Sequence, residues 1–168
     1  MSQGKLESDV LAKRAVRTRF EEQLVERYPD LRPWKGGEVP KMFTCMAWPP
    51  DASKRVFVAL LFGKYDAQFT IECGWVVDGH FPKGVDQYFL DIRRPDGSFE
   101  TRDVRNGVRF RLGELRYPSN DQWWNPIGPR RQDRSIETVE EALRDFALVA
   151  LPFIEQQSGL RLGVRNQP

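Results

Sequence analysis

Apolar residues near the amino terminus recur at helical spacing. Good helix formers predominate from Lys5 to Tyr28, and spacings of about four separate many of the apolar positions. These positions are Leu6, Val10, Phe20, Leu24 and Tyr28. The pattern predicts an amphipathic helix with a charged outer face. The prolines and glycines of YPDLRPWKGG predict a loop directly after it.

Three apolar segments that follow have the pattern of strands. They are MFTCMAW (42–48), RVFVALLFG (55–63) and QFTIECGWVV (68–77). The second is almost entirely apolar, which is typical of a central strand covered on both faces. Because the connections PPDASK and KYDA are short, an antiparallel meander is the expected topology.

The next region contains a turn signal and a strongly alternating segment. Pro95, Asp96 and Gly97 predict a turn, and YFLDIR and SFETRDV on either side could pair as a hairpin, although YFL also fits a helical turn. The segment VRFRLGEL (108–115) alternates, which predicts a strand with apolar side chains on one face and Arg109 and Arg111 on the other.

The carboxy-terminal third predicts a second helix. Ser135 is the expected N-cap, and an apolar stripe follows at spacings of three and four. Pro152 predicts a kink near Leu148 or an early end, and residues 158–168 are expected to form a flexible tail. Together the elements predict one α+β domain over residues 1–168, with a mostly antiparallel sheet of about four to six strands packed against both terminal helices.

Composition supports a globular chain and names no partner by itself. The 168 residues are 40% hydrophobic and 30% charged, with a net charge of +2. That charge is well below the balance of most autonomous DNA-binding domains. The amino terminus lacks the apolar core of a signal peptide, and no stretch approaches about 18 consecutive apolar residues. We therefore expect a cytoplasmic protein without a membrane span.

Charge is nevertheless segregated along the chain. Between residues 102 and 134 there are eight arginines against four acids, and between residues 135 and 157 one arginine against five acids. The basic segment also contains two adjacent tryptophans. Arginine beside tryptophan is typical of protein-interface hot spots and of single-stranded nucleic-acid platforms. A third interpretation is that Arg109 and Arg111 pair with the acidic helix at Glu140 and Asp145, while one or both tryptophans cap the core.

The sequence offers little catalytic chemistry. His80 is the only histidine, and Cys45 and Cys73 lie inside predicted strands as expected for buried thiols. No phosphate-binding glycine motif is present, and we expect neither a cofactor nor a metal. A magnesium-dependent hydrolase is a less favoured alternative, with carboxylates that follow or end strands as its ligands. Those carboxylates are Asp66, Glu72, Asp78 and Asp91.

One family resemblance can be identified on short motifs. The order of an amphipathic helix, FTIECGW, RFRLGEL, DQWW and a helix containing LPFIE resembles the bacterial family known as domain of unknown function 4304, over roughly Arg14 to Gln157. The resemblance implies an α+β fold and supplies no activity. Small proteins of this style without a catalytic set often act as immunity proteins that neutralise a bacterial toxin, which is an argument by analogy.

These observations predict a non-enzymatic protein-binding module, with toxin neutralisation as the expected role. Single-stranded nucleic-acid binding is the main alternative. The candidate contact residues combine the basic segment with nearby loop acids. They are Arg109, Arg111, Arg116, Trp123, Trp124, Asp121 and Asp78.

Overall fold

The structure is a computed structural model with an α+β fold. It describes residues 3–35, 39–50, 52–82, 90–93, 96–102, 107–116 and 122–163, with the backbone alone at 3–6, 90–93, 99–102, 116 and 131.

Five strands form an antiparallel sheet in the order β1-β2-β3-β4-β7. Their bounds are β1 (Arg32–Pro33), β2 (Thr44–Trp48), β3 (Arg55–Phe62), β4 (Phe69–Val76) and β7 (Val108–Arg111). The predicted meander is confirmed, because β2, β3 and β4 are neighbours in sequence and in the sheet. The predicted hairpin is also confirmed, since β5 (Leu90–Arg93) pairs antiparallel with β6 (Phe99–Arg102).

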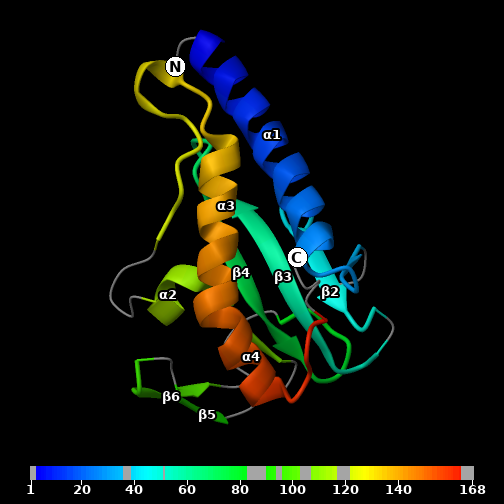
Figure 1. Ribbon diagram of the computed structural model, residues 1–168. Helices are drawn as coiled ribbons and strands as arrows, with labels where there is room; N and C mark the ends of the chain where they lie inside the picture. The colour runs from blue at the N-terminus through cyan, green and yellow to red at the C-terminus, as the bar shows by residue number, and fades with distance from the viewer. Residues whose placement is uncertain are drawn as a thin grey trace.

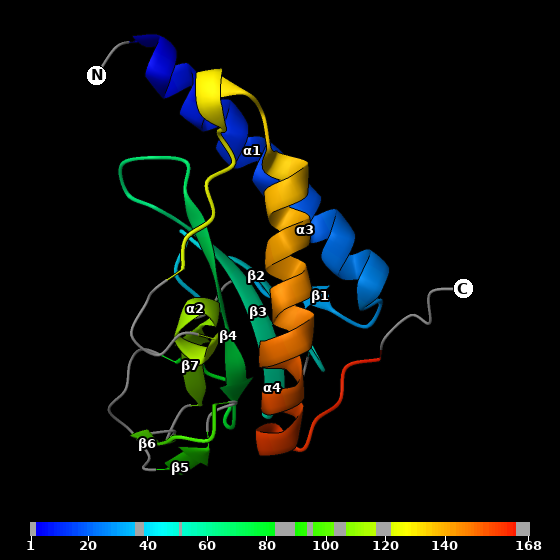
Figure 2. The ribbon, with the colours of Figure 1, turned by 60° about the vertical axis from the view of Figure 1, so that its left-hand side comes forward.

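Helices cover one face of the sheet. Helix α1 (Gln3–Arg27) lies beside a continuous helical rod made of α3 (Ser135–Asp145), the π-helix η2 (Phe146–Ala150) and α4 (Leu151–Ser158) (Figures 1 and 2). The main core lies between this layer and the sheet. Phe20 and Leu24 of α1, Phe146 of η2 and Ile71 of β4 are at most 1% exposed within it. Burial of these side chains is the main force holding the layers together.

The predicted strand over 108–115 is too long. The strand ends at Arg111, and a short helix α2 (Leu112–Arg116) follows. The Glu114 carboxylate accepts a hydrogen bond from the Arg111 backbone N–H at 3.2 Å, a contact of the kind that caps the start of a helix. Alternation of residue types indicates a strand but carries no information on such a local side-chain contact.

The carboxy-terminal helix differs from the prediction at several points. The π-helix η2 lies where a kink near Leu148 or an early end was expected, and the helix continues through Pro152 to Ser158. Ser135, however, is the first helical residue rather than the cap, and its N–H donates to the Asp133 carboxylate at 2.8 Å. The flexible tail predicted for residues 158–168 is wrong over its described part, because Leu162 is only 5% exposed and belongs to the core, and residues 164–168 lie outside the described residues.

The opposite face of the sheet carries a second and smaller apolar cluster. Its buried members are Cys45, Ala47, Phe57, Ala59, Val76 and Phe81. Trp34 and Phe43, on the segments flanking β1 and β2, pack against it. Strand β3 contributes to both clusters, so its nearly continuous apolar sequence is explained by cover on two faces. None of the helices described here has the length and apolar content needed to cross a bilayer.

Candidate functional site

The alternating residues of β7 separate its arginines from the helices. Val108 and Phe110 point into the main core, whereas Arg109 and Arg111 lie on the opposite face of the sheet. This is the alternation that the sequence predicted for these four residues. Strand β7 can come close to β4 because Gly74 has no side chain, and an added Cβ would collide with the backbone carbonyl of Val108.

Both arginines pair with one buried carboxylate. Arg109 Nε lies 3.2 Å from Glu72 Oε2, and Arg111 Nε lies 3.4 Å from Glu72 Oε1. The β4–β7 register produces this arrangement, since Glu72 is directly opposite Arg111. The Glu72 side chain is 6% exposed, but the arginine side chains are 29% and 38% exposed. The acid is therefore enclosed, while both guanidinium groups still contact solvent.

Burial governs the protonation of this carboxyl. It raises the pKa of Glu72 above the ordinary value for glutamic acid. The nearby charges of Arg109 and Arg111 act in the opposite direction, and Glu114 adds a further upward influence. Desolvation of a carboxylate disfavours its charged form, and here it outweighs the two cations. Oε2 also accepts no hydrogen bond from the described residues.

Aromatic rings pack against the two guanidinium groups. The Arg109 guanidinium carbon lies 5.6 Å from the ring centre of Phe81 and 5.9 Å from that of Phe43. The Arg111 carbon lies 5.6 Å from the ring centre of Trp123. These distances are within the range of cation–π attraction. We call the six residues Phe43, Glu72, Phe81, Arg109, Arg111 and Trp123 the arginine face.

The structure separates the candidate contact residues predicted from sequence. Arg109, Arg111 and Trp123 come together on the arginine face. Trp124 belongs to the main core instead, where it is 3% exposed and stacks on Phe69 with ring centres 5.9 Å apart. The adjacent tryptophans therefore face different surroundings.

The other three candidates are not joined to the arginine face by any described contact. Asp78 lies in the exposed turn after β4, where its carboxylate accepts the His80 backbone N–H at 3.1 Å. Arg116 is the last residue of α2 and is described by its backbone alone. Asp121 lies outside the described residues.

Arg109 and Arg111 do not pair with the acidic helix, which corrects that part of the third interpretation, whereas the burial of Trp124 in the main core confirms its other part. Helix α3 and the arginines lie on opposite faces of the sheet, and the carboxylate between Arg109 and Arg111 is that of Glu72. Sequence reasoning had placed Glu72 only among metal ligands. Aligning the alternation of FTIECGWV with that of VRFR places Glu72 on the same face as the arginines, but the register that sets it opposite Arg111 is not contained in the alternation. The aromatic partners Phe43 and Phe81 carry no comparable sequence signal.

The described residues offer little for catalysis. Cys45 and Cys73 are buried, and burial raises the pKa of the Cys45 thiol far above its ordinary range. Such a thiol is a poor nucleophile. In the part of the chain that the structure describes, no three His, Cys, Asp or Glu residues lie together in a way that could hold a metal ion. Glu72 is committed to two arginines, and the Asp66 carboxylate accepts the Gln68 backbone N–H at 3.1 Å.

Comparison with known proteins found no relative of this chain. No family model, no curated protein and no solved structure matches the chain. The resemblance to the domain of unknown function 4304 family therefore stays a prediction.

Proposed function

We propose that this chain is a non-enzymatic binding protein whose arginine face contacts an acidic surface of a protein partner. The observation that carries the proposal is the arrangement around Glu72. Two guanidinium groups are held in place by one enclosed carboxylate and by aromatic rings, yet both stay partly exposed to solvent.

This arrangement suits recognition because its order is established before a partner binds. Arginine and tryptophan are enriched at interface hot spots, where planar groups make large contacts. A guanidinium that is already fixed loses less side-chain entropy on binding than a mobile one. Arg109 and Arg111 are fixed from two directions, by an ion pair and by a ring. Charge-assisted pairs between guanidinium and carboxylate groups are among the stronger polar interactions in proteins.

Charge favours a protein partner over nucleic acid. Glu72 cancels one of the two positive charges on this face, and the whole chain carries only +2. Nucleic-acid affinity depends on neutralising many phosphates, so it needs a larger positive surface. Binding to carboxylates on a protein surface needs only local charge complementarity.

We further propose that the partner is a bacterial toxin and that binding neutralises it in the cytoplasm. This finer role is supported by the analogy with small α+β immunity proteins and by the scarcity of catalytic groups among the described residues. Inhibition by binding requires no chemistry from the inhibitor. Covering the active site or the substrate entrance of the toxin is sufficient.

The test uses a variant that removes both arginine charges without leaving the buried Glu72 carboxylate unpaired. Changing only the arginines would leave Glu72 enclosed and unpaired, which is strongly destabilising. The triple variant Glu72→Gln, Arg109→Gln, Arg111→Gln removes the acid together with both cations. A matched control changes Arg14, Arg144 and Glu140 to Gln, which gives the same charge change at exposed helical positions.

The tagged wild-type chain and both variants are used to capture partners from extracts of the source organism. Each captured protein is purified, and its affinity is measured by calorimetry. We expect an acidic protein that binds wild type and the control equally, and binds the triple variant at least about 100-fold more weakly, because two hot-spot residues are lost. Equal binding by the triple variant would refute the proposal. Capture of nucleic acid alone, with a steep loss on added salt, would favour the nucleic-acid alternative.

A further inference from the structure

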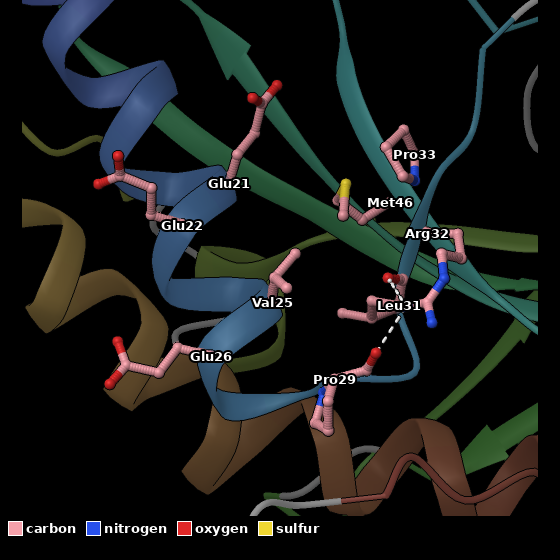
Figure 3. Close-up of a pocket in the computed structure, with 9 residues that line it drawn as sticks. All are labelled: Glu21, Glu22, Val25, Glu26, Pro29, Leu31, Arg32, Pro33 and Met46. Atoms are coloured by element: carbon pink, nitrogen blue, oxygen red, sulfur yellow. Dashed lines mark hydrogen bonds between the residues drawn. The ribbon is translucent and has the colours of Figure 1, made fainter.

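A second surface lies at the other edge of the sheet. A groove of about 660 Å³ runs between the carboxy-terminal part of α1 and the strands β1 and β2 (Figure 3). Its buried residues Leu31 and Met46 belong to the helix-covered face of the sheet, whereas Arg109 and Arg111 lie on the opposite face and on β7, the strand at the opposite edge. The groove is therefore independent of the surface proposed above.

The floor of the groove is apolar. Val25 on α1 faces Leu31 across the gap, and Met46 on β2 projects toward the same space (Figure 3). Leu31 and Met46 are at most 2% exposed, but Val25 is 43% exposed. An aliphatic side chain in a concave site gains free energy when an apolar partner covers it. Val25 is thus the residue of the floor that has most to gain from an occupant.

The helical side of the groove is acidic, and two of its three carboxylates have no described ion pair. Glu21, Glu22 and Glu26 line it, and Glu22 lies 3.4 Å from Arg19. No ion pair joins Glu21 or Glu26 to any residue that the structure describes. The one cation of the lining, Arg32, donates hydrogen bonds to the backbone carbonyls of Pro29 and Leu31. The groove consequently presents net negative charge beside an apolar floor.

The strand side of the groove disfavours an extended peptide. β1 has only two residues, and its second residue, Pro33, has no backbone N–H. An added strand would need donors and acceptors along that edge, which a proline and a short strand do not supply. A helix satisfies its own backbone hydrogen bonds and needs only an apolar face to dock.

We propose that this groove binds an amphipathic helix of a protein partner, with apolar residues on the face that enters the groove and basic residues on the flank beside α1. Apolar side chains of the helix cover Val25 and the floor. Lysine or arginine side chains pair with Glu21 and Glu26.

A defined peptide tests the proposal directly. The probe is a fluorescent peptide of about 14 residues, or roughly four helical turns, with leucines on one face and lysines on its flanks. Its binding to the full chain is followed by fluorescence anisotropy at about 0.15 M salt, where exposed charges are partly screened. A scrambled peptide of the same composition controls for nonspecific attraction, because it has the same charge but no apolar face.

Three variants separate the apolar contribution to peptide binding from the electrostatic one. Val25→Gln keeps the charge and a good helix former, and should weaken binding about tenfold by removing one aliphatic contact. Glu21→Lys with Glu26→Lys should weaken it by at least tenfold, because two attractions become repulsions. Glu7→Lys with Glu140→Lys makes the same charge change on exposed helical positions away from the groove and should change the affinity less than about twofold. All five positions are exposed, so the fold should persist, as circular dichroism would verify.

The expected result is binding of the amphipathic peptide with the scrambled peptide at least tenfold weaker. The proposal is overturned if the scrambled peptide binds equally, if Val25→Gln has no effect, or if both charge-reversal pairs weaken binding alike. It is also overturned if the chain self-associates through this groove, as shown by a dimer in analytical ultracentrifugation that Val25→Gln converts to monomer, since a second copy would then be the occupant.

Discussion

The adjacent residues Trp123 and Trp124 should respond in opposite ways to replacement by alanine. Trp124 is 3% exposed, stacks on Phe69, and is joined to it by two backbone hydrogen bonds of 2.8 and 3.0 Å. Trp123 is half-buried and lies beneath the Arg111 guanidinium. Trp124→Ala should therefore destabilise the fold, whereas Trp123→Ala should weaken partner binding.

The expected loss of stability in Trp124→Ala follows from the surface that Trp124 buries and from its unpaired indole N–H. A buried tryptophan removes on the order of 200 Å² from water, worth about 5 kcal/mol at 25 cal/mol per Å². The indole Nε1 is buried without an acceptor among the described residues, so its removal returns about 1–2 kcal/mol. The free energy of unfolding should fall by about 3–4 kcal/mol in Trp124→Ala. Trp124→Phe keeps an aromatic ring and loses the unpaired N–H, so it should cost less than about 1.5 kcal/mol.

Urea unfolding followed by far-ultraviolet circular dichroism measures all three variants without relying on tryptophan emission. With an m-value of about 2 kcal/mol per M, Trp124→Ala should lower the midpoint by about 1.5–2 M. Trp123→Ala should lower the free energy of unfolding by less than about 1 kcal/mol, as is usual for a partly exposed side chain. The reasoning would be refuted if the two alanine variants were equally stable.

Three further changes test other parts of the structure. Gly107→Ala should lower the free energy of unfolding by about 2–3 kcal/mol and lower the Tm, because Gly107 has a φ of +114° and an added Cβ would collide with the Trp75 carbonyl. Gly97→Ala, in open space at φ +87°, should lower it by only about 1 kcal/mol, and equal losses in the two variants would contradict this. Glu72→Gln should remove a pH dependence of the free energy of unfolding. Because burial raises the folded-state pKa of Glu72, its contribution to stability is present at acid pH and is lost as pH rises through that pKa, so wild type should lose stability relative to the variant as pH increases. A relative gain in urea titrations would contradict the effect of burial. Both cysteine thiols should resist Ellman's reagent in the folded protein and react in denaturant, whereas fast reaction without denaturant would show that they are accessible.

The sequence was sufficient for the fold class and for most elements. Periodicity placed the amino-terminal helix, the three central strands and the carboxy-terminal helix, because each buries one face or two faces against a core. It could not show that a helix follows Arg111, since alternation carries no information on a capping contact such as that of the Glu114 carboxylate. Nor could it show that Leu162 returns to the core, because a short apolar tail carries no period.

The candidate site was only partly visible in the sequence. Alternation placed Arg109 and Arg111 on one face, and this is confirmed. The partner of both arginines comes from β4, about 40 residues earlier, so strand register decides it. The different roles of Trp123 and Trp124 also depend on register, since Trp124 forms a backbone bridge with Phe69 and thereby enters the core. Local composition cannot distinguish two adjacent residues of the same type.

The most direct test of the central claim is the affinity of a purified acidic partner for the wild-type chain and for the triple variant Glu72→Gln, Arg109→Gln, Arg111→Gln. We expect the triple variant to lose at least about 100-fold in affinity while its unfolding midpoint stays close to that of wild type. The matched variant with Arg14, Arg144 and Glu140 changed to Gln should bind as wild type does. Unchanged affinity in the triple variant would contradict the assignment of the arginine face as the binding surface.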